Sequence, residues 1–130
     1  MAEPLIFINS YPLREGALRD YLAAVPDWLR FLEENHPRML HFAAYLSDDN
    51  RDVTVVQVHP DAESMDHQLK VIAGGHVEKW AEFIDWEKMS LMVCGSPGET
   101  TVEHIKQVAG SGVPVSFKRP TGGFNRFPKI

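Results

Sequence analysis

The alternation of apolar and polar residues predicts a small protein built from short strands and amphipathic helices. The apolar run Leu5–Ile8 leads into the turn-forming stretch Asn9–Pro12, which indicates a strand that meets a turn. From Leu18 to Leu32 the apolar residues recur at helical spacing, as expected for a helix covered on one side. Pro26 interrupts this pattern, so we expect a kink or two abutting helices.

The middle of the chain predicts a hairpin followed by two helical segments. Two apolar runs, Met39–Leu46 and Val53–Val58, flank a polar turn, and Asp61 can cap the helix that follows. The apolar stripe of this helix ends at Gly74-Gly75, because glycine pairs stop helices. A second helical stripe comprises Val77, Trp80, Ala81 and Ile84, and a fourth strand is predicted at Met89–Val93.

This order of elements predicts an α+β fold, the ferredoxin-like βαββαβ plan with a four-stranded antiparallel sheet. We expect residues 1–95 to form the domain and residues 96–130 to form a C-terminal extension that packs on the domain or on a dimer partner. The last 36 residues hold six glycines and four prolines, so we expect little regular structure there. A short helix around Val102–Val108 and an extended piece at Val113–Phe117 are the exceptions.

The first and fourth strands are apolar at consecutive positions, which is typical of strands buried on both faces. Two helices packed on one sheet cover only one of its faces, and a large apolar surface would otherwise contact water. We therefore expect a homodimer in which the two sheets pack face to face.

Charge and composition limit the classes of binding partner that we expect for this protein. The net charge of −5 argues against nucleic-acid binding, although residues 113–130 carry four basic and no acidic side chains. We expect a cytoplasmic protein with no membrane partner, since the single cysteine suits a reducing compartment and neither a signal-peptide pattern nor a long apolar span is present. Glycine-rich phosphate loops and GxSxG nucleophile motifs are absent too, which disfavours nucleotide binding and serine hydrolysis by those routes.

The stretch Gln57–His67, followed by Gly74-Gly75-His76, resembles the dimeric α+β barrel superfamily, and in particular the antibiotic-biosynthesis-monooxygenase-like domains. The resemblance covers residues 4–95. It implies a homodimer with one pocket per subunit, between the sheet and its helices. Some members are similar to monooxygenases of quinols or aromatic polyketides that use no metal or flavin. Others degrade haem with an Asn, a Trp and an axial His.

The resemblance implies a set of candidate catalytic residues. Asn9 would hold an oxygen or carbonyl by a hydrogen bond, and His67 and His76 would transfer protons, because an imidazole titrates near neutral pH. A turn role for Asn9 and solvent exposure for the histidines are the alternatives. Three aromatic residues are candidates for substrate binding, with core packing as the alternative: Trp28, Trp80 and Phe83.

We thus expect a small-molecule-binding homodimer with no metal. The first hypothesis for its activity is a cofactor-independent monooxygenase that acts on an aromatic or quinol-type substrate. The first alternative is a haem-binding or haem-degrading monooxygenase with His76 as the axial ligand. The second is a non-catalytic domain that binds a small apolar or aromatic molecule, because a fold does not fix a function.

Overall fold

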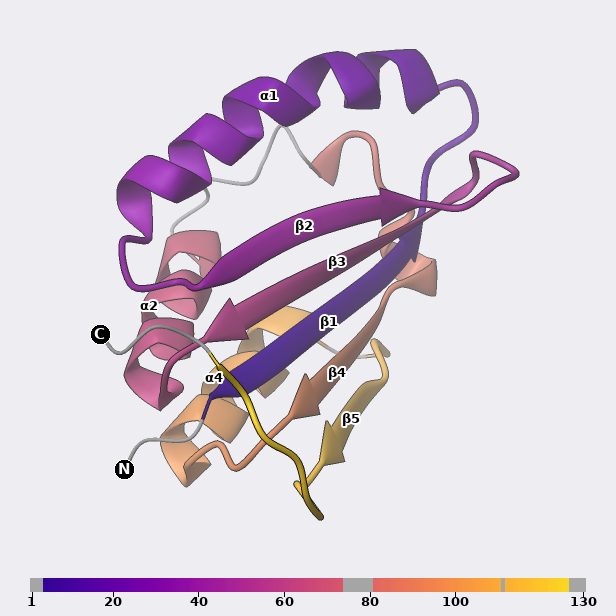
Figure 1. The fold of residues 1–130 in the computed structure, drawn as a ribbon. Helices are drawn as coiled ribbons and strands as arrows, with labels where there is room; N and C mark the ends of the chain where they lie inside the picture. The colour runs from indigo at the N-terminus through magenta and orange to yellow at the C-terminus, as the bar shows by residue number, and fades with distance from the viewer. Residues whose placement is uncertain (1–3, 74–80, 111, 127–130) are drawn as a thin grey trace.

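The computed structural model describes residues 4–73, 81–110 and 112–126 of the 130-residue chain (Figure 1). The order of strands and helices predicted for the domain is confirmed, and α2 is the helix of its second half. In chain order the elements are β1 (Leu5–Pro12), α1 (Leu18–Asn35), β2 (His41–Leu46), β3 (Asp52–His59), α2 (Ala62–Ala73), the 3-10 helix η1 (Trp86–Lys88), β4 (Ser90–Cys94), α4 (Glu99–Ala109) and β5 (Val115–Lys118).

The sheet has five strands in the order β2-β3-β1-β4-β5, so the expected four-stranded antiparallel sheet is wrong at one edge. The pairs β1–β3, β1–β4 and β2–β3 are antiparallel, whereas β5 lies parallel to β4. The Gly95 N–H donates to the Lys118 carbonyl at 2.9 Å and so fixes this edge. The four residues of β5 are too few to show a strand period, and a parallel partner is set by contacts distant in sequence.

The described helices α1, α2 and α4 lie on one face of the sheet (Figure 1). The side chains of this inner face form the core, where Phe7 of β1 and Val93 of β4 are at most 1% exposed. Helix α1 contributes Tyr21, α2 contributes Met65 and Leu69, and α4 contributes Ile105. Pro26 lies inside α1, which runs unbroken from Leu18 to Asn35, so two abutting helices do not form.

Helix α2 starts where the sequence predicts it. The Oδ1 atom of Asp61 accepts a hydrogen bond from the Ser64 backbone N–H at 3.0 Å, which satisfies one of the free donors of the first turn. Arg38 forms an ion pair with Asp61, and this contact lowers the pKa of the Asp61 carboxyl. The cap holds the first turn of α2 against the end of β3.

The second predicted helical stripe lies partly outside the described residues, because Val77 and Trp80 fall within residues 74–80. In the part that follows, Ile84 forms an isolated bridge with Leu13, and the short helix η1 precedes β4.

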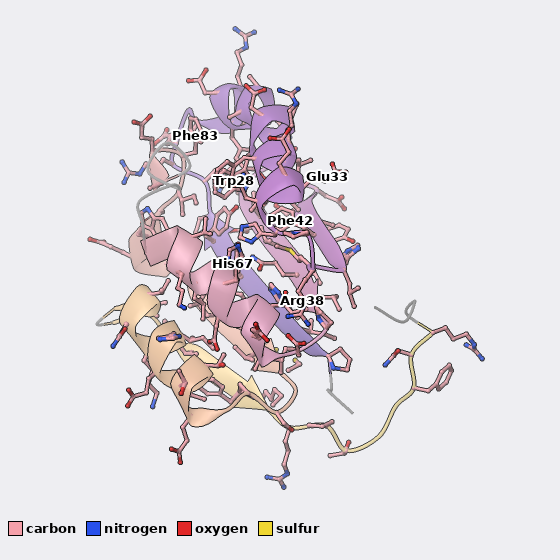
Figure 2. The ribbon with its side chains drawn as sticks, turned by 90° about the vertical axis from the view of Figure 1, so that its left-hand side faces the viewer. Trp28, Glu33, Arg38, Phe42, His67 and Phe83 are labelled. Carbon is pink, nitrogen blue, oxygen red and sulfur yellow. The ribbon has the colours of Figure 1, made fainter. Side chains whose placement is uncertain are left out.

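The outer face of the sheet is apolar at its centre and carries none of the described helices. Ile6 and Ile8 of β1 project there, beside Val56 of β3 and Met92 of β4. These four side chains are half-buried, not fully buried. Residues 119–126 follow β5 on this side and are exposed throughout, standing away from the sheet (Figures 1 and 2).

Gly95 is the glycine on which the packing of β1 against β4 depends. Its φ is +131°, and a Cβ atom there would lie 2.6 Å from Leu5 Cδ2 and 3.0 Å from the Pro4 carbonyl oxygen. We expect Gly95→Ala to lower the free energy of unfolding by roughly 2 kcal/mol, measured by urea denaturation. Gly122→Ala is the matched control, because no atom lies within 4 Å of the added methyl group. Equal stability of the two variants would contradict this account.

Candidate functional site

A cavity that is partly open to solvent lies between the inner face of the sheet and the helices. The resemblance implies a pocket in this place. Most of its wall is apolar. The aromatic part of the wall consists of Phe7 and Tyr11 from β1, Trp28 from α1, Phe42 from β2 and Trp86 from η1. Figure 2 shows Trp28 and Phe42 in the region between α1 and the sheet.

Three side-chain amides interrupt the apolar wall: Asn9 on β1, Gln57 on β3 and Gln68 on α2. Asn9 pairs in register with Val55, so Gln57 is its diagonal neighbour on the same face of the sheet. The Asn9 Oδ1 and Gln68 Oε1 atoms are buried and have no hydrogen-bond partner among the described residues. The Gln57 Oε1 atom accepts a hydrogen bond from His59 Nε2 at 3.1 Å.

Two buried amide oxygens without a partner are unusual, because most buried polar atoms in native proteins form hydrogen bonds. Leaving such a group unpaired costs roughly 1–3 kcal/mol. Both oxygens belong to residues of the cavity wall, and a turn of either side-chain amide would bring its oxygen to a ligand with a hydroxyl or N–H group. The cavity therefore combines an apolar wall with a few polar groups, which is the usual character of a small-molecule site.

The structure brings together only some of the residues predicted from the sequence. Asn9 and Trp28 line the cavity. Phe83 is half-buried against the core but is not part of the cavity wall. His76 and Trp80 lie outside the described residues.

His67 is exposed and lies outside the cavity wall. Its Nε2 atom donates to the Asn35 carbonyl at the end of α1, at 2.9 Å. Its ring stands edge-on to that of His36, with 5.0 Å between the ring centroids. His36 is only 5% exposed, and neither of its ring nitrogens has a partner among the described residues. Burial, and then the nearby His67, lowers the pKa of His36 to about 4.

Gln57 and Gln68 were not predicted from the sequence as site residues, although the sequence holds a signal for one of them. In β3 the inner positions Val53 and Val55 are followed at the same spacing by Gln57 and His59. Polar residues that continue a core pattern mark a candidate site, because burying them without partners is costly. Gln68 gives no such signal, since a glutamine on a helix is usually at the surface.

No cluster of three or more potential metal-ligating side chains occurs within residues 4–73, 81–110 and 112–126. No helix in this part of the chain is long and apolar enough to cross a membrane.

Comparison with solved structures identifies the class of fold. MupZ from Pseudomonas fluorescens superposes with a TM-score of 0.70 at 12% identity, over 97% of this chain and 91% of MupZ. SnoaB from Streptomyces nogalater, a cofactor-independent oxygenase, gives 0.59 at 12% identity, over 75% of this chain and 96% of SnoaB. A protein from Bacteroides thetaiotaomicron, provisionally named an antibiotic biosynthesis monooxygenase, gives 0.54 at 14% identity, over 68% and 85% of the two chains.

These neighbours confirm the resemblance as a likeness of fold: the chain shares its fold with SnoaB and with the protein named as an antibiotic biosynthesis monooxygenase. No family model matches the sequence, and no curated protein matches it. At such low identity the likeness shows the fold alone.

Proposed function

We propose that the cavity binds an aromatic or quinol-type small molecule and that the protein acts as a cofactor-independent monooxygenase. One observation carries the proposal: the wall of an apolar cavity includes Asn9 and Gln68, whose buried amide oxygens lack partners among the described residues. The apolar wall suits the ring system, and the oxygens suit its hydroxyl groups. The fold shared with SnoaB, an oxygenase without a cofactor, supports the choice of reaction.

In this proposal the substrate itself supplies the electrons. Loss of a phenolic proton spreads negative charge onto a ring carbon, which can then react with dioxygen directly. In sum, a ring CH₂ in the keto form and O₂ give a C=O group and one water molecule, so the carbon is oxidised and dioxygen is reduced. Asn9 orients the phenolic oxygen through its amide. Proton acceptance stays assigned to His76, which lies outside the described residues.

The haem alternative depends on His76, the expected axial ligand, which lies outside the described residues. None of the described residues in the cavity wall is a histidine.

Asn9→Leu tests the proposal, because it removes the amide while keeping the volume of the side chain. We expect oxygen consumption with a panel of hydroxylated naphthalenes and anthrones to fall roughly a hundredfold, as for other groups that stabilise developing charge. Ser10→Ala is the matched control, since the adjacent side chain projects from the opposite face. His67→Ala is expected to retain activity, because this ring lies outside the cavity wall.

Fluorescence of Trp28 and Trp86, which both line the cavity, reports binding separately from turnover. The proposal fails if the unaltered protein neither consumes oxygen nor changes its fluorescence with any compound of the panel. Binding without oxygen consumption would leave the non-catalytic binding domain as the function.

A further inference from the structure

The chain continues beyond β5 as an exposed arm, residues 119–126. Every residue of the arm is exposed, and Phe124 is 81% exposed. The arm extends away from the sheet on its outer side, opposite the helices (Figures 1 and 2). The guanidinium carbon of Arg126 lies 4.7 Å from the centroid of the Phe124 ring. The arm thus presents an aromatic ring and a cation side by side, and these two residue types are enriched at protein–protein interfaces.

The distribution of charge along the chain indicates which partner suits this arm. Residues 113–130 carry four basic and no acidic side chains, whereas residues 1–112 carry 9 basic and 18 acidic side chains. A basic arm is attracted to a surface of opposite charge, and the acidic body of a second copy of this chain provides one.

A groove on the body of the protein has a matching character. It lies between the C-terminal half of α1 and the start of β2, and its wall is mostly apolar: Leu29, Leu32, Pro37, Met39, Leu40 and Phe42. Glu33 adds a carboxylate to this wall, which also includes His36 and His41. Apolar surface beside a negative charge is the complement of the Phe124 ring and the Arg126 guanidinium.

The order of the strands places this groove within reach of a second copy's arm. Strands β2 and β5 are the two edges of the sheet. If two outer faces pack about a two-fold axis parallel to the strands, the β5 edge of one copy lies over the β2 edge of the other. Facing sheets are about 10 Å apart, and the chain from Lys118 to Phe124 spans up to roughly 20 Å when extended. The arm is therefore long enough to cross to the groove beside the β2 edge of the second copy.

We propose that the arm of each copy docks in the groove between α1 and β2 of a second copy. Phe124 packs on the apolar wall, and Arg126 pairs with Glu33 of the other chain. The two copies exchange arms, so the dimer holds this contact twice. The inference goes beyond the proposed function and does not depend on what the cavity binds.

Charge reversal tests the contact by sedimentation equilibrium. We expect Glu33→Arg to raise the dimer Kd about tenfold, because like charges then meet at both copies of the contact. Glu34→Arg is the matched control, since it makes the same change in charge at an exposed position of α1 outside the groove wall. It should change the Kd by less than about threefold. The double variant Glu33→Arg/Arg126→Glu should return to within about threefold of the unaltered protein.

Disulfide trapping tests which chain receives the arm. In a Cys94→Ser background, protein carrying Leu29→Cys is mixed with protein carrying Phe124→Cys and oxidised mildly. We expect a covalent product of twice the mass of one chain, because Leu29 lies in the groove wall and is 38% exposed. Glu103→Cys, at an exposed position of α4, replaces Leu29→Cys in the control and should give little of this product.

The other outcomes overturn the proposal. A monomeric unaltered protein at micromolar concentration would exclude a second copy as the partner. A disulfide within one chain of a Leu29→Cys/Phe124→Cys double variant, without the covalent dimer, would place the arm on its own domain. Equal effects of Glu33→Arg and Glu34→Arg, or a double variant that stays weak, would exclude the pairing of Arg126 with Glu33. Thermal unfolding verifies that each variant remains folded, as expected for substitutions at exposed positions.

Discussion

Replacing Ile8 by lysine is expected to convert a dimer of this protein into monomers of 14.7 kDa, measured by sedimentation equilibrium at micromolar concentration. Ile8 lies on β1, near the centre of the outer face, with Val56 on one side and Met92 on the other. We propose that a second copy packs its own outer face here. A lysine at the centre of such an interface buries an unpaired charge, which costs several kcal/mol and weakens association by more than about a hundredfold.

The apolar character of this face is the reason to expect a partner. Ile6 and Val56 are half-buried in the single chain, and Tyr45 is 55% exposed on the same face. Contiguous exposed apolar surface of this kind usually marks an interface. Ala23→Lys on the exposed side of α1 is the control and should remain dimeric. A monomeric unaltered protein at micromolar concentration, or a dimeric Ile8→Lys variant, would refute the arrangement.

Acid is expected to destabilise the fold well before the carboxylates titrate. Burial lowers the pKa values of His36 and His59 to about 4, from the usual 6.5. Both rings are neutral in the folded state, whereas the unfolded chain takes up protons below about pH 6.5. Their contribution to the free energy of unfolding is therefore complete above about pH 6.5. It is lost progressively as the pH falls toward 4. The loss approaches roughly 3 kcal/mol for His59 and is smaller for His36, whose ring lies nearer the solvent.

His36→Phe isolates one half of this effect, because it replaces a buried ring whose nitrogens have no partners in the described part of the chain. Urea denaturation at about pH 7 and about pH 4.5 should show a smaller acid loss for this variant than for the unaltered protein. Asp61 stays ionised through this window, since the Arg38 hydrogen bond lowers the pKa of its carboxyl. His41→Phe, at an exposed position, should leave the acid loss unchanged. If all three proteins lose the same free energy of unfolding in acid, then His36 does not take up a proton when the chain unfolds.

Much of the architecture was predictable because local pattern and local geometry agree. The helical spacing from Leu18 onward, the polar turn between β2 and β3, and the Asp61 cap each depend on residues close in sequence. Strand β5 was not predicted as part of the sheet, because its four residues are defined as a strand only by their pairing with β4. The helix predicted around residues 102–108 lies within the longer α4.

The candidate site was likewise predictable from the sequence only in part. Asn9 stands out in the sequence because it directly follows an apolar run, and the structure puts it in the cavity wall. The sequence equally favoured His67, yet its ring meets the end of α1 instead. Which side of a helix faces a cavity depends on how the helices pack against the sheet, and nothing within α2 alone specifies this.

By itself the sequence determined the order of the elements, the apolar character of both faces of the sheet and the resemblance to a class of fold. Only the tertiary structure decided which polar residues share a cavity. Asn9, Gln57 and Gln68 come from three separate elements and meet because β1 and β3 pair in one register and α2 packs across them. Hydrogen bonds between such distant residues depend on strand register and helix packing, and local propensity fixes neither.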